Sequence, residues 1–240
     1  LEMRIALLSW EAVHSIYIGG VAFHVTELAC ALQRKGHEVH VFTRMGRPNH
    51  ARHECIHGVH YHRCPFDSNQ NFIEEIHNMC RSFCNSFFET EDHVGRFDVV
   101  HAHDWLAAPA MYWIKKGRAH HTVFTIHSTE YGRCGNNFFG GNSEQIRHIE
   151  WEACYEADHV IAVSHALKNE VQWIYSTPNE KVDVVYNGID YRQFDGWIEP
   201  AGVKRMYDIG PMDPMVLFVG RMVYQKGVDL LVSAIPYVLN

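Results

Sequence analysis

A buried strand that ends in a run of polar residues is the stretch of this sequence best suited to chemistry. Residues 122–126 are β-branched or aromatic, which is typical of a strand covered on both faces, and His127, Ser128 and Glu130 follow at once. In open α/β sheets, ligands bind just outside the carboxyl ends of the strands. We therefore predict that the reaction centre lies at His127 and that the other motifs deliver groups to it.

The segment His101-Ala-His-Asp-Trp105 closes a second predicted strand. Alternation along a strand places His101 and His103 on one side and Asp104 on the other. Imidazole and carboxylate groups are good metal ligands, so a metal site at these three residues is one interpretation. However, no further ligand cluster has suitable spacing, and Asp104 can instead cap the helix that Trp105 opens. We therefore predict no metal here.

Two turns that contain glycine precede predicted helices. Gly19 and Gly20 stand before the first helix, where glycine lets the backbone approach a ligand and the helix start attracts phosphate. In the stretch 220–227, Arg221 offers a planar fork for phosphate and Lys226 adds a second positive charge. The first turn matches neither the dinucleotide nor the Walker pattern. The second turn indicates a diphosphate ligand, whereas the first alone is often only a tight turn.

Strand and helix patterns alternate through most of the chain, which predicts an α/β fold with a doubly wound, mostly parallel sheet. The predicted strands are 4–8, 39–42, 59–63, a strand from 98 to about 103, 122–126, 159–163 and 182–186. The predicted helices are 21–35, 72–88, 106–116, 143–157 and 166–175. A polar loop at 128–142 follows the His127 strand. Loops of this length are usually functional, so we expect it to shape the choice of ligand.

The pattern changes after residue 195. We predict a first domain at 3–195, a linker rich in Gly, Pro and Asp at 196–214, and the start of a second domain at 215–240, with a strand at 215–219 and a helix at 228–239. One such unit is too small to bury both faces of its strand. The chain is therefore expected to be truncated within the second domain, and residues 215–240 to pack on a neighbouring surface, such as a second copy.

Composition bounds the function class. The chain has 240 residues, 47% of them hydrophobic, and a formal charge of −7, which argues against nucleic acid and anionic membranes as partners. The seven cysteines are scattered, as expected of reduced thiols in a cytoplasmic protein. No signal peptide or membrane-spanning stretch of roughly 20 apolar residues occurs. Of the nineteen histidines, His60 and His62 share one face of a predicted strand and form a second, weak metal candidate.

Taken together, these motifs resemble the large retaining glycosyltransferase family 4, especially its glycogen-synthase-like branch. The matching stretches keep the family's order along nearly the whole chain: 19–24, 101–105, 125–130, 157–164, 184–190 and 217–227. Each stretch alone is a weak signal, whereas the ordered set is a strong one. The resemblance implies a GT-B fold, in which two Rossmann-like domains hold the active site between them. It also implies a sugar, such as glucose, transferred from UDP-glucose or ADP-glucose to a carbohydrate acceptor.

The resemblance also implies roles for individual residues. His127 would be the active-site histidine near the anomeric carbon. The donor phosphates would be held by four residues: Gly19, Gly20, Arg221 and Lys226. The acceptor sugar would be held by three: Asp104, Glu130 and Tyr131. The leaving diphosphate would help to deprotonate the acceptor, without a protein nucleophile, a metal or a cofactor.

One departure and three alternatives accompany this interpretation. The family's second domain carries a further Glu-x7-Glu motif, which should lie past residue 240, so the chain alone is expected to be inactive. One alternative is another GT-B enzyme, such as a sugar-nucleotide epimerase or a phosphorylase. The others are a metal-dependent hydrolase that uses His101, His103, Asp104 and His127, and a carbohydrate-binding module without catalysis.

Overall fold

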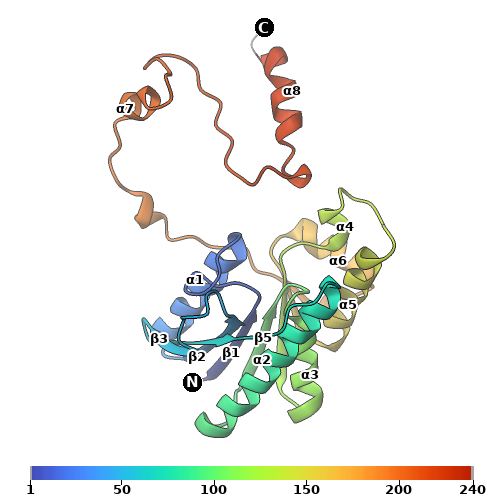
Figure 1. Cartoon of the computed structure of the whole chain (residues 1–240). Helices are drawn as coiled ribbons and strands as arrows, with labels where there is room; N and C mark the ends of the chain where they lie inside the picture. The colour runs from blue at the N-terminus through green and yellow to red at the C-terminus, as the bar shows by residue number, and fades with distance from the viewer. Residues whose placement is uncertain (1, 239–240) are drawn as a thin grey trace. The chain divides into compact units, whose positions relative to one another are not determined.

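The computed structural model describes residues 2–238, without the side chain of Gln193. The chain divides into two compact units, Leu1–Asn187 and Gly188–Asn240, which are described separately (Figure 1). Compact units are defined by contacts and do not test domain boundaries. The predicted domain ranges 3–195, 196–214 and 215–240 therefore stay a prediction. Among the described residues, every helix is too short or too polar to cross a membrane.

The first unit alternates strands and helices. Its strands are β1 Arg4–Ser9, β2 Glu38–Arg44, β3 His53–Ile56, β4 Val59–Cys64, β5 Val99–His103, β6 His121–Ile126, β7 His159–Ala162 and β8 Val182–Val184. Its helices are α1 Gly20–Arg34, α2 Phe72–Val94, α3 Ala108–Arg118, α4 Glu130–Arg133, α5 Asn142–Glu156 and α6 His165–Tyr175, with a 3₁₀ turn at Asn179–Lys181.

The eight strands form one sheet in the order β3-β4-β2-β1-β5-β6-β7-β8. All pairs are parallel except β3 with β4. The predicted doubly wound, mostly parallel sheet is therefore confirmed. Strand β3 was not predicted, because its residues are mostly exposed at the sheet edge and show no buried alternation.

Helices cover both faces of this sheet, as the alternation along β1 shows. Ile5 and Leu7 pack with Val25 of α1 on one face. Ala6 and Leu8 belong to the larger core on the other face, which includes residues of α2, α3 and α5 (Figure 1). Successive side chains point to opposite faces of a strand, so β1 contributes to both cores.

A cluster of imidazoles lies at the sheet edge on strands β2, β3 and β4. His40 Nδ1 lies 2.9 Å from His62 Nε2, and His40 Nε2 donates to Glu38 over 3.0 Å. His53 and His60 stack beside them, with ring centroids 5.4 Å apart. Burial lowers the pKa of His40 to about 4, although the bond to Glu38 raises it, and burial with neighbouring imidazoles lowers the pKa of His62 to about 3. The predicted sharing of one face by His60 and His62 is confirmed.

This cluster predicts a fall in stability as the pH drops. In the unfolded chain, His40 and His62 take up protons near their ordinary pKa of 6.5, whereas the folded chain resists until about pH 4 or below. Their stabilising effect is therefore complete above about pH 6.5 and is lost toward pH 4, by up to about 1.4 kcal/mol per group and pH unit. Glu89 and His93 of α2 also line this hollow. Urea unfolding at pH 7.5 and 5.0 measures the effect.

The variant His62→Phe is the matched comparison, because His62 already stacks on Phe42 at a centroid distance of 4.5 Å. Losing one titratable ring should make the pH dependence shallower by about one proton's slope. Equal pH dependence in the variant and the parent chain would contradict the role of this cluster.

The second unit contains helices α7 Pro200–Arg205 and α8 Val228–Val238, with short 3₁₀ turns at Tyr191–Phe194 and Tyr224–Lys226. The predicted strand at 215–219 is wrong, because these residues form no strand. Leu217 and Val219 are 72% and 84% exposed. A strand needs a hydrogen-bonded neighbour, and none is present among the described residues of this unit. The predicted helix at 228–239 forms, although its last residue lies outside the described part.

Candidate functional site

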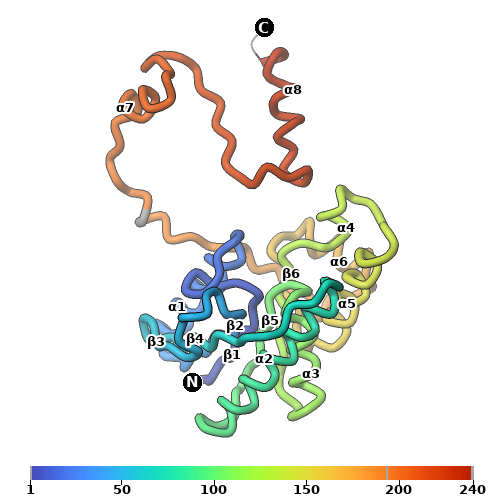
Figure 2. Tube along the Cα trace, in the orientation of Figure 1, coloured from blue at the N-terminus to red at the C-terminus, as the bar shows by residue number. Residues whose placement is uncertain are grey.

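The candidate site lies where the sheet reverses its direction of winding. Strand β1 is hydrogen-bonded to β2 on one side and to β5 on the other, and β6 follows β5 (Figure 2). The register places Ser9 beside His103, and His103 beside Thr125, so the carboxyl ends of β1, β5 and β6 are level. Ligands of doubly wound folds bind at such switch points. His127 comes directly after β6, as predicted.

Asp104 positions the backbone of His127. Asp104 has a positive φ of 59°, which turns the chain sharply after β5. Its Oδ1 accepts a hydrogen bond from the backbone N–H of His127 over 2.8 Å, and its own N–H donates to Thr125. Burial raises the pKa of Asp104 to about 6, although the amides of His127 and Ser128 oppose this rise. Asp104 therefore holds the end of β6. This structural role was not predicted from the sequence, where Asp104 was a candidate for acceptor binding.

Three imidazoles meet at this edge of the sheet. His103 Nδ1 lies 3.3 Å from His127 Nε2. His24, one turn into α1, contacts both rings, with centroids 5.3 Å from His103 and 4.8 Å from His127. One nitrogen of each ring lies within 4.8 Å of the other two, an arrangement suited to a metal ion. His103 Nε2 is buried and has no hydrogen-bond partner among the described residues.

These imidazoles are neutral near pH 7. Burial lowers the pKa of His24 to about 4, and burial also lowers the pKa of His127 to about 4. The pKa of the fully enclosed His103 lies well below its ordinary value, because burial and three neighbouring imidazoles disfavour its charge. His101 lies on the same side of β5 as His103, as predicted, but its Nε2 is 2.7 Å from the Thr125 hydroxyl. The metal ligands considered from the sequence were His101, His103, Asp104 and His127. The fold instead brings His24 together with His103 and His127.

The turn at Gly19 and Gly20 is organised by Glu11, which the sequence analysis did not identify. The carboxylate of Glu11 accepts hydrogen bonds from the amides of Ile18, Gly19 and Ala22, at 2.8, 2.9 and 3.3 Å. Gly20 begins α1, and a Cβ placed on it would meet nothing within 4 Å. Protein packing alone therefore does not require glycine at position 20, and His24 on the same helix brings this turn to His127.

A buried ion-pair network supports the segment after His127. Arg133 donates to the Ser128 carbonyl over 2.7 Å and to Glu130 over 3.1 Å, and it pairs with Glu150. Glu150 is fully buried, accepts from the Glu130 amide over 3.0 Å, and also accepts from the Tyr175 hydroxyl. The carboxylate of Glu130 is thus engaged by Arg133 instead of pointing freely into the site.

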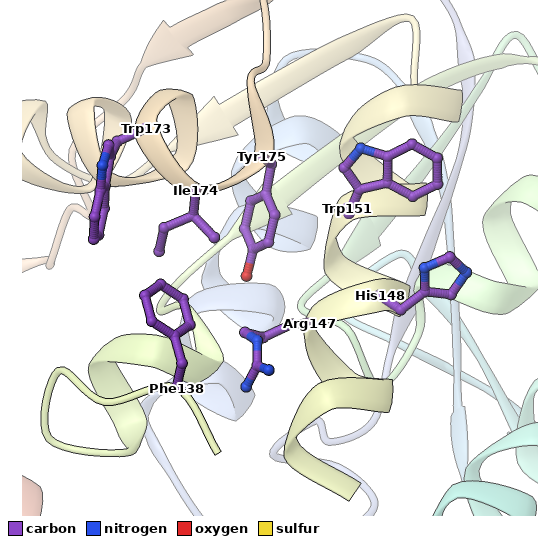
Figure 3. A pocket seen from close by; sticks show the side chains of 7 residues that line it. All are labelled: Phe138, Arg147, His148, Trp151, Trp173, Ile174 and Tyr175. Atoms are coloured by element: carbon purple, nitrogen blue, oxygen red, sulfur yellow. The ribbon is translucent and has the colours of Figure 1, made fainter. Parts of the chain in front are cut away.

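Tyr131 is partly exposed and joins the site to an aromatic hollow. Its ring lies 4.7 Å from that of Phe138 and 5.3 Å from that of Trp173. Both rings line a pocket of about 420 Å³ between the residues that follow α4, helix α5 and helix α6. Figure 3 shows Phe138 below Ile174, with Arg147 beside the Tyr175 hydroxyl. The residues after β6 are thus part helix and part pocket wall, although the sequence analysis predicted a loop.

Arg221 and Lys226 belong to the second unit. Lys226 ends the 3₁₀ turn Tyr224–Lys226, directly before Gly227 and α8, and both cations are exposed. Within the first unit, the fold gathers His127, Asp104, Glu130, Tyr131 and the glycine turn around one edge of the sheet. His24 was not predicted as a site residue either. The sequence signal that could have identified it is its position four residues after Gly20, on the helix that packs against β1.

Comparisons with known proteins agree with this geometry. The sequence model of Glycosyltransferase Family 4 matches residues 18–193. A glycosyltransferase from Methanocaldococcus jannaschii, itself uncharacterised, is 37% identical over 99% of this chain and 60% of its own length. A glycogen synthase from Mycobacterium tuberculosis is 30% identical over 98% of this chain and 58% of its own. The chain thus spans about 60% of the length of these relatives.

A solved structure shares the fold. The catalytic domain of starch synthase IV from Arabidopsis thaliana, bound to ADP and acarbose, aligns with a TM-score of 0.71 at 17% identity, covering 100% of this chain and 66% of that one. At this identity the likeness concerns the fold alone. The family match and the curated relatives go further: the chain belongs to glycosyltransferase family 4, as a glycogen-synthase-like member.

Proposed function

We propose that this chain forms the acceptor-side lobe of a retaining hexosyltransferase, which moves glucose from UDP-glucose or ADP-glucose to a carbohydrate acceptor without a metal or cofactor. The observation that carries the proposal is the partly buried, neutral imidazole of His127 at the switch point, beside the N-terminus of α1. The ADP bound to the starch synthase and the name of the glycogen synthase relative support the choice of donor and acceptor.

The proposed reaction breaks the bond between the anomeric carbon and the diphosphate, so negative charge builds on the leaving group. The helix N-terminus at Gly20, together with Arg221 and Lys226, would stabilise that charge. A neutral His127 can hydrogen-bond a sugar hydroxyl without bringing a buried charge. The carboxylates of Glu11, Asp104 and Glu130 are engaged in the hydrogen bonds described above, which supports a mechanism without a protein nucleophile.

The acceptor would lie along Tyr131, which is partly exposed, whereas Glu130 is buried. Aromatic faces pack well against apolar sugar surfaces, and Phe138 and Trp173 continue from Tyr131 toward the pocket. Asp104 and Glu130 would act by holding the backbone around His127. This assignment gives the segment after β6 the main influence on acceptor choice.

The proposal also covers the second unit and the cellular compartment of the reaction. Because the described residues of the second unit form no sheet that could hold a nucleotide, we expect these 240 residues alone not to transfer sugar. Exposed apolar side chains such as Leu217 and Val219 favour self-association through this unit. The seven free cysteines suit the reducing cytoplasm, where we place the reaction.

Gly20→Ala tests the phosphate contact at α1. Because a Cβ at this position meets no protein atom within 4 Å, the free energy of unfolding should change by less than about 0.5 kcal/mol. If donor phosphate approaches this backbone, however, the KM for the nucleotide sugar should rise about tenfold, a loss of roughly 1.4 kcal/mol. The KM is measured by steady-state kinetics in a catalytically competent form, meaning a form of the protein that transfers sugar. The free energy of unfolding is measured by urea unfolding.

The matched control is Gly196→Ala, because a Cβ at Gly196 also meets nothing within 4 Å and the position lies in the second unit, away from this turn in sequence. Gly196→Ala should change neither quantity. An unchanged donor KM in Gly20→Ala would remove the glycine turn from the donor site.

A further inference from the structure

We infer that His24, His103 and His127 form a binding site for a transition-metal ion such as Zn²⁺, and that metal bound there blocks the sugar-transfer centre. The metal is an inhibitor in this inference, since the proposed reaction needs none. The ligands come from three separate elements: α1, the end of β5, and the residue after β6. Among the described residues, this is the group that satisfies metal-ligand geometry.

The distances between the rings fit a tetrahedral centre. With Zn–N bonds of about 2.05 Å, two ligand nitrogens lie about 3.3 Å apart and the ring centroids about 5.2 Å apart. His103 Nδ1 and His127 Nε2 are already 3.3 Å apart. The three centroid distances are 4.8, 5.3 and 5.5 Å. One nitrogen of each ring lies within 4.8 Å of the other two, so side-chain movements of up to about 1.5 Å would bring the set to the tetrahedral spacing.

The ligand chemistry of the rings also suits a metal. Histidine binds a metal through the lone pair of a ring nitrogen, and one nitrogen of each of the three rings lies within 4.8 Å of the other two. Imidazoles favour Zn²⁺, Cu²⁺, Ni²⁺ and Co²⁺ over Mg²⁺ or Ca²⁺, which prefer oxygen ligands. Three histidines leave a fourth position open for water or a sugar hydroxyl.

Access and burial distinguish this group from a surface histidine cluster. His103 is 1% exposed, whereas His24 and His127 are partly exposed and open the site to solvent. In the sheet-edge group His40, His53, His60 and His62 the rings also stack, but among the described residues no three of them have the ligand-atom spacing of a metal site. They therefore serve as an internal comparison within the same chain.

Inhibition follows from the position of His127 and rests on the proposed function. A metal that takes the Nε2 lone pair of His127 removes this nitrogen from sugar binding and occupies the space beside the anomeric carbon. Binding itself does not depend on that function, because it requires only the three nitrogens.

The binding experiment uses the 240-residue chain at pH 7.5. We expect one equivalent of Co²⁺ to give the visible absorption of a tetrahedral site, and one equivalent of Zn²⁺ to displace it, with affinities from calorimetry. His24→Gln should weaken Zn²⁺ binding by about 100-fold or more. His60→Gln, at the sheet edge, should bind as the parent chain does. Circular dichroism checks that both variants fold.

Three results would overturn the inference: no stoichiometric metal at this pH, equal affinity in folded His24→Gln, or loss of binding in His60→Gln. The inhibition experiment runs in parallel in a catalytically competent form, where Zn²⁺ should stop transfer and a chelator should restore it. Metal binding without any turnover of nucleotide sugar would refute the proposed function and leave this site standing. Turnover that Zn²⁺ does not affect would refute the inference alone.

Discussion

Replacing His127 with alanine is expected to lower the rate of glycosyl transfer by about 100-fold or more, while the protein stays folded. The imidazole lies at the switch point, its backbone is held by Asp104, and it is neutral at the working pH. Removing it takes away the group that faces the sugar in our proposal and leaves a water-filled gap. The measurement is the release of UDP or ADP from the nucleotide sugar in the presence of a glucan acceptor, in a catalytically competent form.

His121→Ala is the matched control for this experiment. His121 starts the same strand, β6, but it is exposed and lies at the opposite end from the site. Its substitution should leave the transfer rate within about twofold of the parent, the expectation for a surface change of less than about 0.5 kcal/mol. If His127→Ala transfers sugar at the parent rate, the imidazole has no part in the reaction and our assignment of the centre is wrong.

Replacing Arg133 with methionine is expected to lower the free energy of unfolding by about 3–5 kcal/mol. The substitution leaves the buried carboxylate of Glu150 with only the Glu130 amide and the Tyr175 hydroxyl as partners. Because Glu150 is fully buried, water does not replace the lost guanidinium. Arg133 also holds the Ser128 carbonyl, so the transfer rate should fall as well. Urea unfolding monitored by circular dichroism gives the first quantity.

Lys116→Met provides the control, because Lys116 pairs with Glu156 over 3.1 Å while it is 54% exposed. Exposed pairs contribute about 0–1 kcal/mol, so this variant should lose little. A double-mutant cycle with Glu150→Gln then isolates the buried pair, and its coupling energy should exceed about 1 kcal/mol. An Arg133 variant as stable as Lys116→Met would show that the network does not hold the segment after β6.

The architecture of the first unit could be predicted from the sequence because strands and helices leave periodic signals. Alternation predicted that His101 and His103 share a face, and the rings stack at 4.3 Å. Ser164 stands just before the helix predicted at 166–175, and its hydroxyl caps α6 by accepting from the Leu167 amide over 3.1 Å. Such features depend on neighbours within a few residues, which the sequence displays directly.

Glycine was a less reliable guide, because it serves packing as well as turns. The helix predicted at 106–116 ends just before Gly117, yet α3 continues through this glycine to Arg118 and is capped by Ala119, which has a φ of 51°. A Cβ at Gly117 would lie 3.1 Å from the Phe88 ring, so this glycine makes room for α2. The strand predicted at 215–219 is absent for a different reason. Its apolar residues have no neighbouring strand to pair with in the described part of the second unit.

Local periodicity and chain direction were enough to predict most elements of the first unit, the parallel sheet and the position of His127 at a strand end, whereas the edge strand β3 and the short helix α4 left no such signal. Only the tertiary structure decided which side chains meet at that strand end. His24 reaches His103 and His127 because α1 packs over the sheet, and Glu11 reaches the glycine turn because the loop after β1 folds back on it. His24 precedes His103 by 79 positions and His127 by 103 positions in the sequence. Such distant residues come into contact through the packing of whole elements, which no local pattern encodes.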